Sequence, residues 1–195
     1  MSIKFRVIFG FLLAILLVSA ATTTLTAWRM REDANAYFVT SSQQQLTVMD
    51  GFLFSFVEAV RKNVALLAAP EDLREAGPSF PNFSHTTSDS IYLQSDLEPE
   101  AASAMVLLHN MSKAHQEYIE IYAGFPDGNY ATTVDRGSVP AGYSTSQRSW
   151  YTSTAQSARD DKLVNAYLSL TGEMVFAVTH KMRGADGEFK GVVGI

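Results

Sequence analysis

The chain has 195 residues, of which 47% are hydrophobic and 18% charged, and its formal net charge is -5. This composition excludes a disordered or fibrous protein and predicts a folded core. The acidic balance argues against nucleic acid as a partner, because the surface would repel phosphates. The absence of cysteine excludes disulfides, thiolate catalysis and thiolate metal sites.

The first 28 residues combine a short basic leader with an apolar segment. Lys4 and Arg6 lie in the leader, residues 1–6, and residues 7–28 carry no charge. About 20 such residues span a bilayer core, and the positive-inside bias places the leader in the cytoplasm. We therefore predict a transmembrane helix over 7–28. The alternative is a signal peptide cleaved after Ala20, and in both cases the remaining chain is exported to the periplasmic or extracellular side.

Residues 29–69 continue as a long helical pattern that Pro70 ends. Apolar residues recur at steps of three and four and form one stripe, which comprises Leu46, Met49, Leu53, Phe56, Val60, Val64 and Leu67. We expect this stripe to pack against the chain's own domain. The membrane-proximal part of the helix also offers a surface for a homodimer.

The rest of the chain, residues 70–195, predicts an α+β domain. Residues 70–95 are rich in turn formers, and a helix with Pro99 in its first turn is expected to run to about Gln116. A short helix is expected over 149–159. Strand patterns follow at 118–122, 130–134, 163–167, 174–182 and 189–195. This order favours an antiparallel sheet with helices gathered on one side.

Motifs of enzymes are missing, and we predict no catalytic residue, no metal and no cofactor. His109 and His115 are six residues apart on one helix, which turns them about 240° from each other. His85 and His180 have no ligand at metal-binding spacing. The adjacent acids at 160–161 are expected at a solvated helix end rather than as an acid and base pair.

One stretch carries the residue types of a ligand site. Arg148 is surrounded by Tyr143, Trp150 and Tyr151, and Tyr167 follows further along. The planar guanidinium matches a carboxylate, while the aromatic residues provide stacking faces and polar tips. Such a mixture suits a small polar ligand. The alternative is an arginine paired to a surface acid beside a tryptophan that fills the core.

These residues resemble a known sensor family. The Tyr-(x)4-Arg-x-Trp-Tyr stretch, the turn at 184–187 and the closing strand at 191–195 are similar to the membrane-distal half of a double Cache domain. Such domains are the periplasmic sensory regions of methyl-accepting chemotaxis receptors, and also of sensor histidine kinases and diguanylate cyclases. The resemblance implies a PAS-like membrane-distal module at 70–195. In the family a membrane-proximal module, a second membrane helix and a cytoplasmic signalling part follow. We therefore expect this chain to be a truncated receptor in which the apolar stripe near Leu46 and Met49 is partly uncovered.

The resemblance also implies roles for individual residues. In the amino-acid-binding members, the tyrosine, arginine and Trp-Tyr positions hold the ligand carboxylate, and a further tyrosine with two aspartates holds the amine. The matching residues here are Tyr143, Arg148, Trp150, Tyr151 and Tyr167. The first aspartate is replaced by Ser169, which cannot neutralise an ammonium group, and the second would follow Ile195. The resemblance therefore favours a small carboxylate ligand.

Together these features predict the extracytoplasmic ligand-sensing module of a chemoreceptor. It is expected to be anchored in the inner membrane and to have a small carboxylate or amino-acid-like ligand and a second copy as partners. The sensor region of a histidine kinase or diguanylate cyclase is an alternative. An exported protein-interaction domain without a small-molecule pocket is a further one. A secreted hydrolase is the least supported, because no nucleophile lies beside a base.

Overall fold

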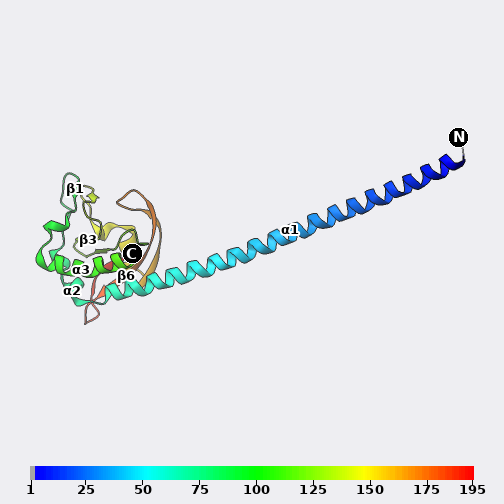
Figure 1. Ribbon diagram of the computed structural model, residues 1–195. Coiled ribbons are helices and arrows are strands. Elements are labelled where there is room, and N and C mark those ends of the chain that lie inside the picture. The colour runs from blue at the N-terminus through cyan, green and yellow to red at the C-terminus, as the bar shows by residue number, and fades with distance from the viewer. Residues whose placement is uncertain (1–2) are drawn as a thin grey trace. The chain divides into compact units, whose positions relative to one another are not determined.

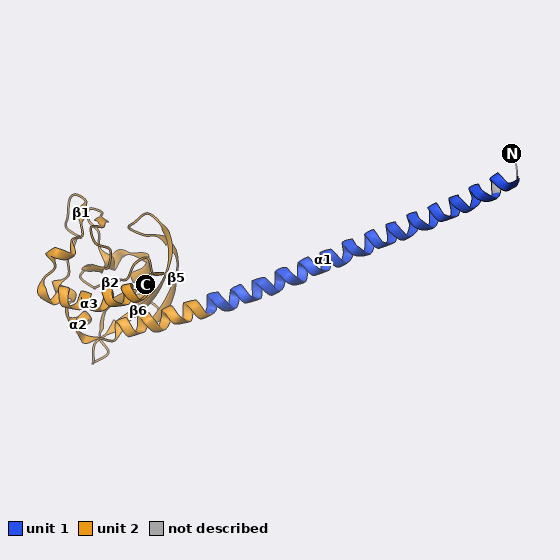
Figure 2. Ribbon diagram, viewed as in Figure 1, with its two compact units in different colours: residues 1–54 blue, residues 55–195 orange. Residues whose placement is uncertain are grey.

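The structure, a computed structural model, describes residues 3–195, so the first two residues of the predicted leader lie outside the described residues. The chain divides into two compact units, of which the first ends at Phe54 and the second is Ser55–Ile195 (Figure 2). The first unit is helix alone in its described part, and the second contains every strand.

Helix α1 spans Ile3–Ala68 without interruption, so the predicted segments 7–28 and 29–69 are one helix (Figure 1). It ends before Pro70, as expected. Among the described residues it is the one helix long and apolar enough to cross a membrane, and none of its apolar window is buried. The hydroxyls of Thr22, Thr23 and Thr24 donate to backbone carbonyls three or four residues earlier. These polar groups are therefore satisfied within the helix itself, as a lipid environment requires.

The apolar stripe of α1 packs in its last part only. Val60, Val64 and Leu67 are buried in the core of the second unit. Leu46 and Met49 are 61% and 60% exposed, so the stripe packs on the chain's own domain in its last part only, and the stripe near Leu46 and Met49 is uncovered, as expected. The physical reason is that residues 3–54 contain no second element against which these side chains could be buried.

The second unit is built on a five-stranded antiparallel sheet, which confirms the predicted α+β class. The strand order is β3-β2-β7-β6-β5. The strands are β2 (Tyr122–Gly124), β3 (Tyr130–Thr132), β5 (Asp161–Leu168), β6 (Met174–Arg183) and β7 (Phe189–Gly194). A separate two-stranded sheet pairs β1 (Ser90–Ile91) with β4 (Ser138–Val139).

Helices cover both faces of the five-stranded sheet, so the expectation that they gather on one side is wrong. The helices after α1 are α2 (Glu71–Glu75), α3 (Pro99–Ala114) and α4 (Ser149–Ala155), and the 3-10 turns are η1 (Gly77–Ser79), η2 (Gln94–Asp96) and η3 (Thr145–Gln147). One core cluster joins α1 and α3 to Ala123 and Val193, and the other joins α4 to Tyr122 and Val192. Since adjacent strand residues point to opposite faces and both are apolar, each face needs a cover.

The first predicted strand begins later than expected. Residues 118–121 are not strand, and β2 starts at Tyr122. The Tyr118 ring stacks on His115 at 4.8 Å, and its hydroxyl accepts a hydrogen bond from Asn63 at 2.8 Å. The backbone N–H of Ile121 donates to the Thr133 hydroxyl at 3.0 Å instead of to a strand partner. Side-chain contacts thus hold this segment outside the ladder.

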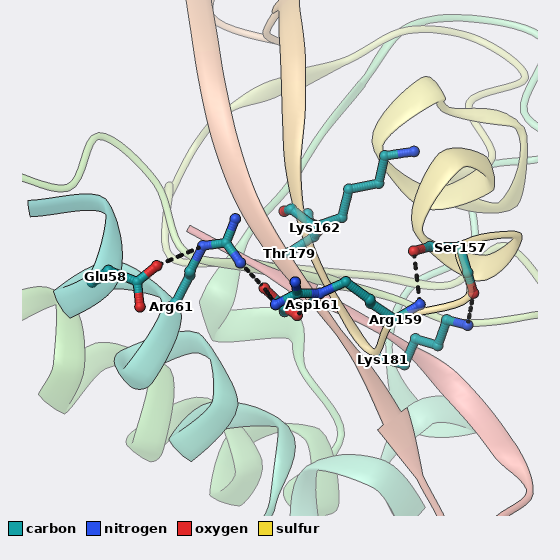
Figure 3. A network of polar contacts seen from close by, with 8 residues as sticks. All are labelled: Glu58, Arg61, Ser157, Arg159, Asp161, Lys162, Thr179 and Lys181. Carbon is teal, nitrogen blue, oxygen red and sulfur yellow. Dashed lines mark hydrogen bonds and ion pairs between the residues drawn. The ribbon is translucent and has the colours of Figure 1, made fainter. Parts of the chain in front are cut away.

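The paired acids at 160–161 do not end a helix. Asp161 opens β5 and forms ion pairs with Arg61 of α1 and with Arg159 (Figure 3). Arg61 also pairs with Glu58 at 3.3 Å. The side chains of Arg61 and Asp161 are only 26% and 19% exposed. The network therefore fastens the end of α1 to the outermost strand of the sheet.

Candidate functional site

The segment that carries the predicted ligand residues is anchored at both ends by buried hydroxyls. Thr145 of η3 donates to the carbonyl oxygen of Asn129 at 2.9 Å. Thr154, in the last turn of α4, lies 2.6 Å from the hydroxyl of Thr179 on β6. Because both threonines are fully buried, these bonds fix η3 and α4 on the sheet and so position Arg148 between them.

Five of the six predicted ligand residues line one small cavity: Tyr143, Arg148, Trp150, Tyr167 and Ser169. Its remaining lining residues are Glu120, Tyr122, Tyr130 and Leu170. The cavity measures about 10 Å³, which is room for at most one water molecule. A ligand at this position therefore needs either side-chain movement or an approach from a neighbouring cavity.

The sixth predicted residue, Tyr151, does not line this cavity. It is buried, with its ring packed edge-on against Trp150 at 5.8 Å and Phe189 at 5.9 Å. Its hydroxyl is buried and has no hydrogen-bond partner in the described part of the chain. In this arrangement Tyr151 supports the ring of Trp150.

Arg148 is held but not neutralised. Its guanidinium lies over the ring of Tyr143, 5.4 Å from the ring centre. One terminal nitrogen donates to the Leu168 carbonyl at 3.5 Å, whereas Nε is buried without a partner. No ion pair among residues 3–195 involves Arg148, so the alternative of an arginine paired to a surface acid does not describe the structure. A cation with an unused donor is what an incoming carboxylate requires.

The aromatic walls are neutral at physiological pH. Burial raises the pKa of Tyr143, Tyr122 and Tyr130 well above the usual range, and the positive charge of Arg148 only partly offsets this for the pKa of Tyr143. The hydroxyls of Tyr122 and Tyr167 lie 2.9 Å apart. The charged side chains of the cavity are therefore Arg148 and Glu120.

Glu120 is the site residue that sequence reasoning missed. Its Oε1 accepts hydrogen bonds from the hydroxyls of Tyr130 and Thr132, both at 2.5 Å. The alternation over 118–122 places Glu120 and Tyr122 on one face, which was the available signal. This alternation alone could not show that Glu120 belongs to the site, because the sequence does not indicate that Tyr130 and Thr132 contact it.

Two larger cavities adjoin the site. One, of about 220 Å³, shares Glu120, Tyr130 and Leu170 with it and is also lined by Tyr92 and by β4. The Tyr92 hydroxyl is buried without a hydrogen-bond partner in the described residues. The other, of about 170 Å³, is a mainly apolar groove between the last part of α1 and the ends of β5 and β6. No group of acidic and histidine side chains that could hold a metal occurs in residues 3–195.

Comparison with known proteins identifies the fold. A scan against family models and a search of curated proteins found no match. Solved structures do match: the ligand-binding domain of the Pseudomonas fluorescens chemoreceptor CtaA in complex with L-valine has a TM-score of 0.52 at 19% identity, over 72% of this chain and 52% of that one. The chain shares with this structure an α+β fold of the Cache/PAS-like type.

Two further structures share this fold. The ligand-binding domain of the Pseudomonas aeruginosa PAO1 amino acid chemoreceptor PctB, in complex with L-Arg, has a TM-score of 0.52 at 20% identity, over 72% of this chain and 48% of that one. The sensor domain of the V. cholerae histidine kinase DctB has a TM-score of 0.58 at 16% identity, over 80% of this chain and 54% of that one. The chain spans about half the length of these structures.

Proposed function

We propose that this chain is the extracytoplasmic sensing region of a transmembrane chemoreceptor and that it binds a small ligand through a carboxylate at Arg148. The observation that carries the proposal is the buried, unpartnered Nε of a cation that lies among aromatic walls. Tyr143 and Trp150 orient the carboxylate, and Tyr167 closes the far side. The chemoreceptor likenesses support the sensing role at the level of fold.

The same proposal assigns the domains. Residues 7–28 form a membrane anchor, residues 29–69 a long periplasmic helix, and residues 70–195 the membrane-distal module. The exposed apolar window near the N-terminus supports the anchor, and the continuation of α1 to Ala68 supports the long helix that follows it. In this arrangement the protein lies in the inner membrane with its sensing domain in the periplasm.

A histidine kinase is the second candidate for the whole protein, because the DctB sensor domain has the same fold with a TM-score of 0.58. Ligand binding at Arg148 is common to both candidates. The output is tested separately, by fusing the chain to the signalling part of a chemoreceptor or of a kinase and measuring the response to the ligand.

The binding proposal is tested by titrating the full chain in detergent with a panel of small carboxylates in a calorimeter. Removing one partner of a buried charge pair costs about 2 to 5 kcal/mol, so Arg148→Ala is expected to weaken binding of the best carboxylate by about 30-fold or more. Arg159→Ala is the matched control, because Arg159 is 74% exposed and lies outside the cavity. Equal affinities for wild type and Arg148→Ala would remove Arg148 from the site.

A further inference from the structure

We propose that the ligand is a straight-chain aliphatic monocarboxylate, whose carboxylate lies at Arg148 and whose alkyl chain lies in the apolar groove beside α1. This inference rests on the proposed function and deepens it, because it names the chemical class of the ligand. The groove holds about 170 Å³, and its apolar lining includes Val57 and Val60 of α1, Leu163 of β5 and Phe176 of β6.

The groove and the cavity at Arg148 share one wall. Glu120, Tyr122, Tyr167 and Ser169 line both of them. The cavity at Arg148 holds about 10 Å³, which leaves no room beyond the carboxylate itself. A ligand whose carboxylate reaches Arg148 must therefore place the rest of its atoms in an adjoining space, and the groove is such a space.

The lining of the groove suits an uncharged chain. Within residues 3–195 no lysine, arginine or histidine lines it, so a second anionic group would find no partner there. Glu117 and Glu120 line it and would repel such a group. Most of the other lining side chains are apolar, and Phe176 and Leu163 are 73% and 43% exposed. An alkyl chain covers this apolar surface and buries no polar group of its own.

Two tyrosine hydroxyls separate the groove from Arg148. The hydroxyls of Tyr122 and Tyr167 lie 2.9 Å apart. Tyr122 is 4% exposed, and its ring packs edge-on against Trp150 at 4.7 Å, so it is held in place. Tyr167 is only partly buried and follows the point at which the register between β5 and β6 shifts. Rotation of Tyr167 therefore opens the passage and breaks one hydrogen bond between neutral groups.

A chain in this groove contacts α1 itself. Val57 and Val60 belong to the helix that continues to the apolar segment 7–28. The ligand would therefore connect α1 to β5 and β6, in addition to the ion pair of Arg61 with Asp161. This contact gives the length of the alkyl chain a direct effect on how firmly the end of α1 is held.

Straight-chain acids from propanoate to octanoate test the inference on the full chain in detergent, by calorimetry with the heat of micelles alone subtracted. Each methylene that enters the groove is expected to tighten binding by about threefold to fourfold. 6-Aminohexanoate should bind more weakly than hexanoate, because its ammonium group would enter an apolar groove. An affinity that does not rise with chain length, or tighter binding of 6-aminohexanoate, overturns the inference.

Leu163→Trp tests where the chain lies. The larger side chain fills part of the groove from an exposed position, and it should weaken octanoate binding by about tenfold or more while propanoate binding stays unchanged. Met174→Trp is the matched control, because Met174 is 71% exposed and does not line the groove. Equal octanoate affinities in the two variants would contradict the assignment of the groove.

A photoreactive probe locates the chain in the wild type, where no folding defect can interfere. An octanoate analogue with a terminal diazirine is expected to label residues 56–60 or 175–178, which line the groove. Label on residues 134–139, beside the cavity of about 220 Å³, overturns the inference. If acids bind in an Arg148-dependent way without a gain from chain length, this inference alone fails. If no acid binds, or if Arg148→Ala changes no affinity, the proposed function fails and the inference with it.

Discussion

Gly191 occupies a backbone position on β7 that no other residue can adopt without strain. Its φ is +153°, and a Cβ there would lie 2.5 Å from the carbonyl oxygen of Gly124. The ladder register between β6 and β7 shifts at this point, as a bulge requires. Gly191 therefore permits the close approach of β7 to β2, the strand whose Tyr122 lines the site.

Gly191→Ala is expected to lower the free energy of unfolding by about 3 kcal/mol or more, since steric overlap adds to a strained φ. Gly187→Ala is the control: its φ is +84°, but open space surrounds the added methyl. The control should cost only about 1 kcal/mol. Urea unfolding of both variants gives the comparison, and equal losses would show that the Gly124 contact relaxes without cost.

Alkaline pH is expected to destabilise the fold through buried tyrosines. Burial raises the pKa of Tyr92 and of Tyr151 to about 12 from an ordinary value of 10. Above pH 10 the unfolded chain loses these protons and the folded chain keeps them, so stability is complete below pH 10 and falls as the pH rises toward 12. Each tyrosine contributes a slope of about 1.4 kcal/mol per pH unit.

Urea unfolding between pH 8 and pH 12 measures this slope. The double variant Tyr92→Phe/Tyr151→Phe should show a shallower fall than wild type, because two of the ionisable groups are gone. Identical slopes would mean that both hydroxyls already reach solvent in the folded protein.

Among the helices and strands, hydrophobic periodicity predicted those whose formation depends on the local sequence. The patterns of α1, α3 and β5 to β7 are long, and the structure places these elements within a few residues of their expected bounds. Residues 118–121 alternate as a strand would, but stacking of Tyr118 on His115 and the Thr133 hydroxyl hold them elsewhere. Such contacts join residues distant in sequence, so no local pattern could indicate them.

The residues of the candidate site likewise include some that the local sequence predicted and one that it did not. Tyr143, Arg148 and Trp150 are close in sequence and were recognisable as a group of complementary residue types. Glu120 lines the cavity two residues before β2, where the hydroxyls of Tyr130 and Thr132 hold its carboxylate, and local sequence does not indicate these contacts. The exposure of the membrane-proximal half of the α1 stripe likewise depends on whether another element covers it.

The junction of α1 and β5 yields a prediction about the ion-pair network shown in Figure 3. Asp161→Ala removes the less exposed of the two carboxylates that pair with the partly buried guanidinium of Arg61, and is expected to cost about 1 to 3 kcal/mol. Arg159→Ala removes the 74% exposed partner of the same carboxylate, and should cost less than about 0.5 kcal/mol.

A double-mutant cycle of Arg61→Ala and Asp161→Ala checks this assignment by urea unfolding. We expect a coupling energy of about 1 kcal/mol or more between the two positions. Additive losses would show that the pair adds no stability and that apolar packing alone holds the end of α1.

For the molecule as a whole, the decisive question is whether α1 is retained in the membrane. We expect protein purified from membranes to keep the apolar segment 7–28, because its uncharged span has bilayer length. N-terminal sequencing measures this directly, and a chain beginning at Ala21 would establish a cleaved signal peptide. A phosphatase that works only in the periplasm, fused after residue 69, should be active in either case.

The turn between β5 and β6 has a practical consequence for optical detection. Leu170 and Thr171 of this turn line the larger cavity, and the neighbouring Glu173 is exposed. Because the chain contains no cysteine, Glu173→Cys would create a single attachment point for a thiol-reactive dye two residues from the cavity lining. If a ligand binds at Arg148, as proposed, it is expected to change the polarity around the dye and therefore its emission, so fluorescence would report binding without a further reagent.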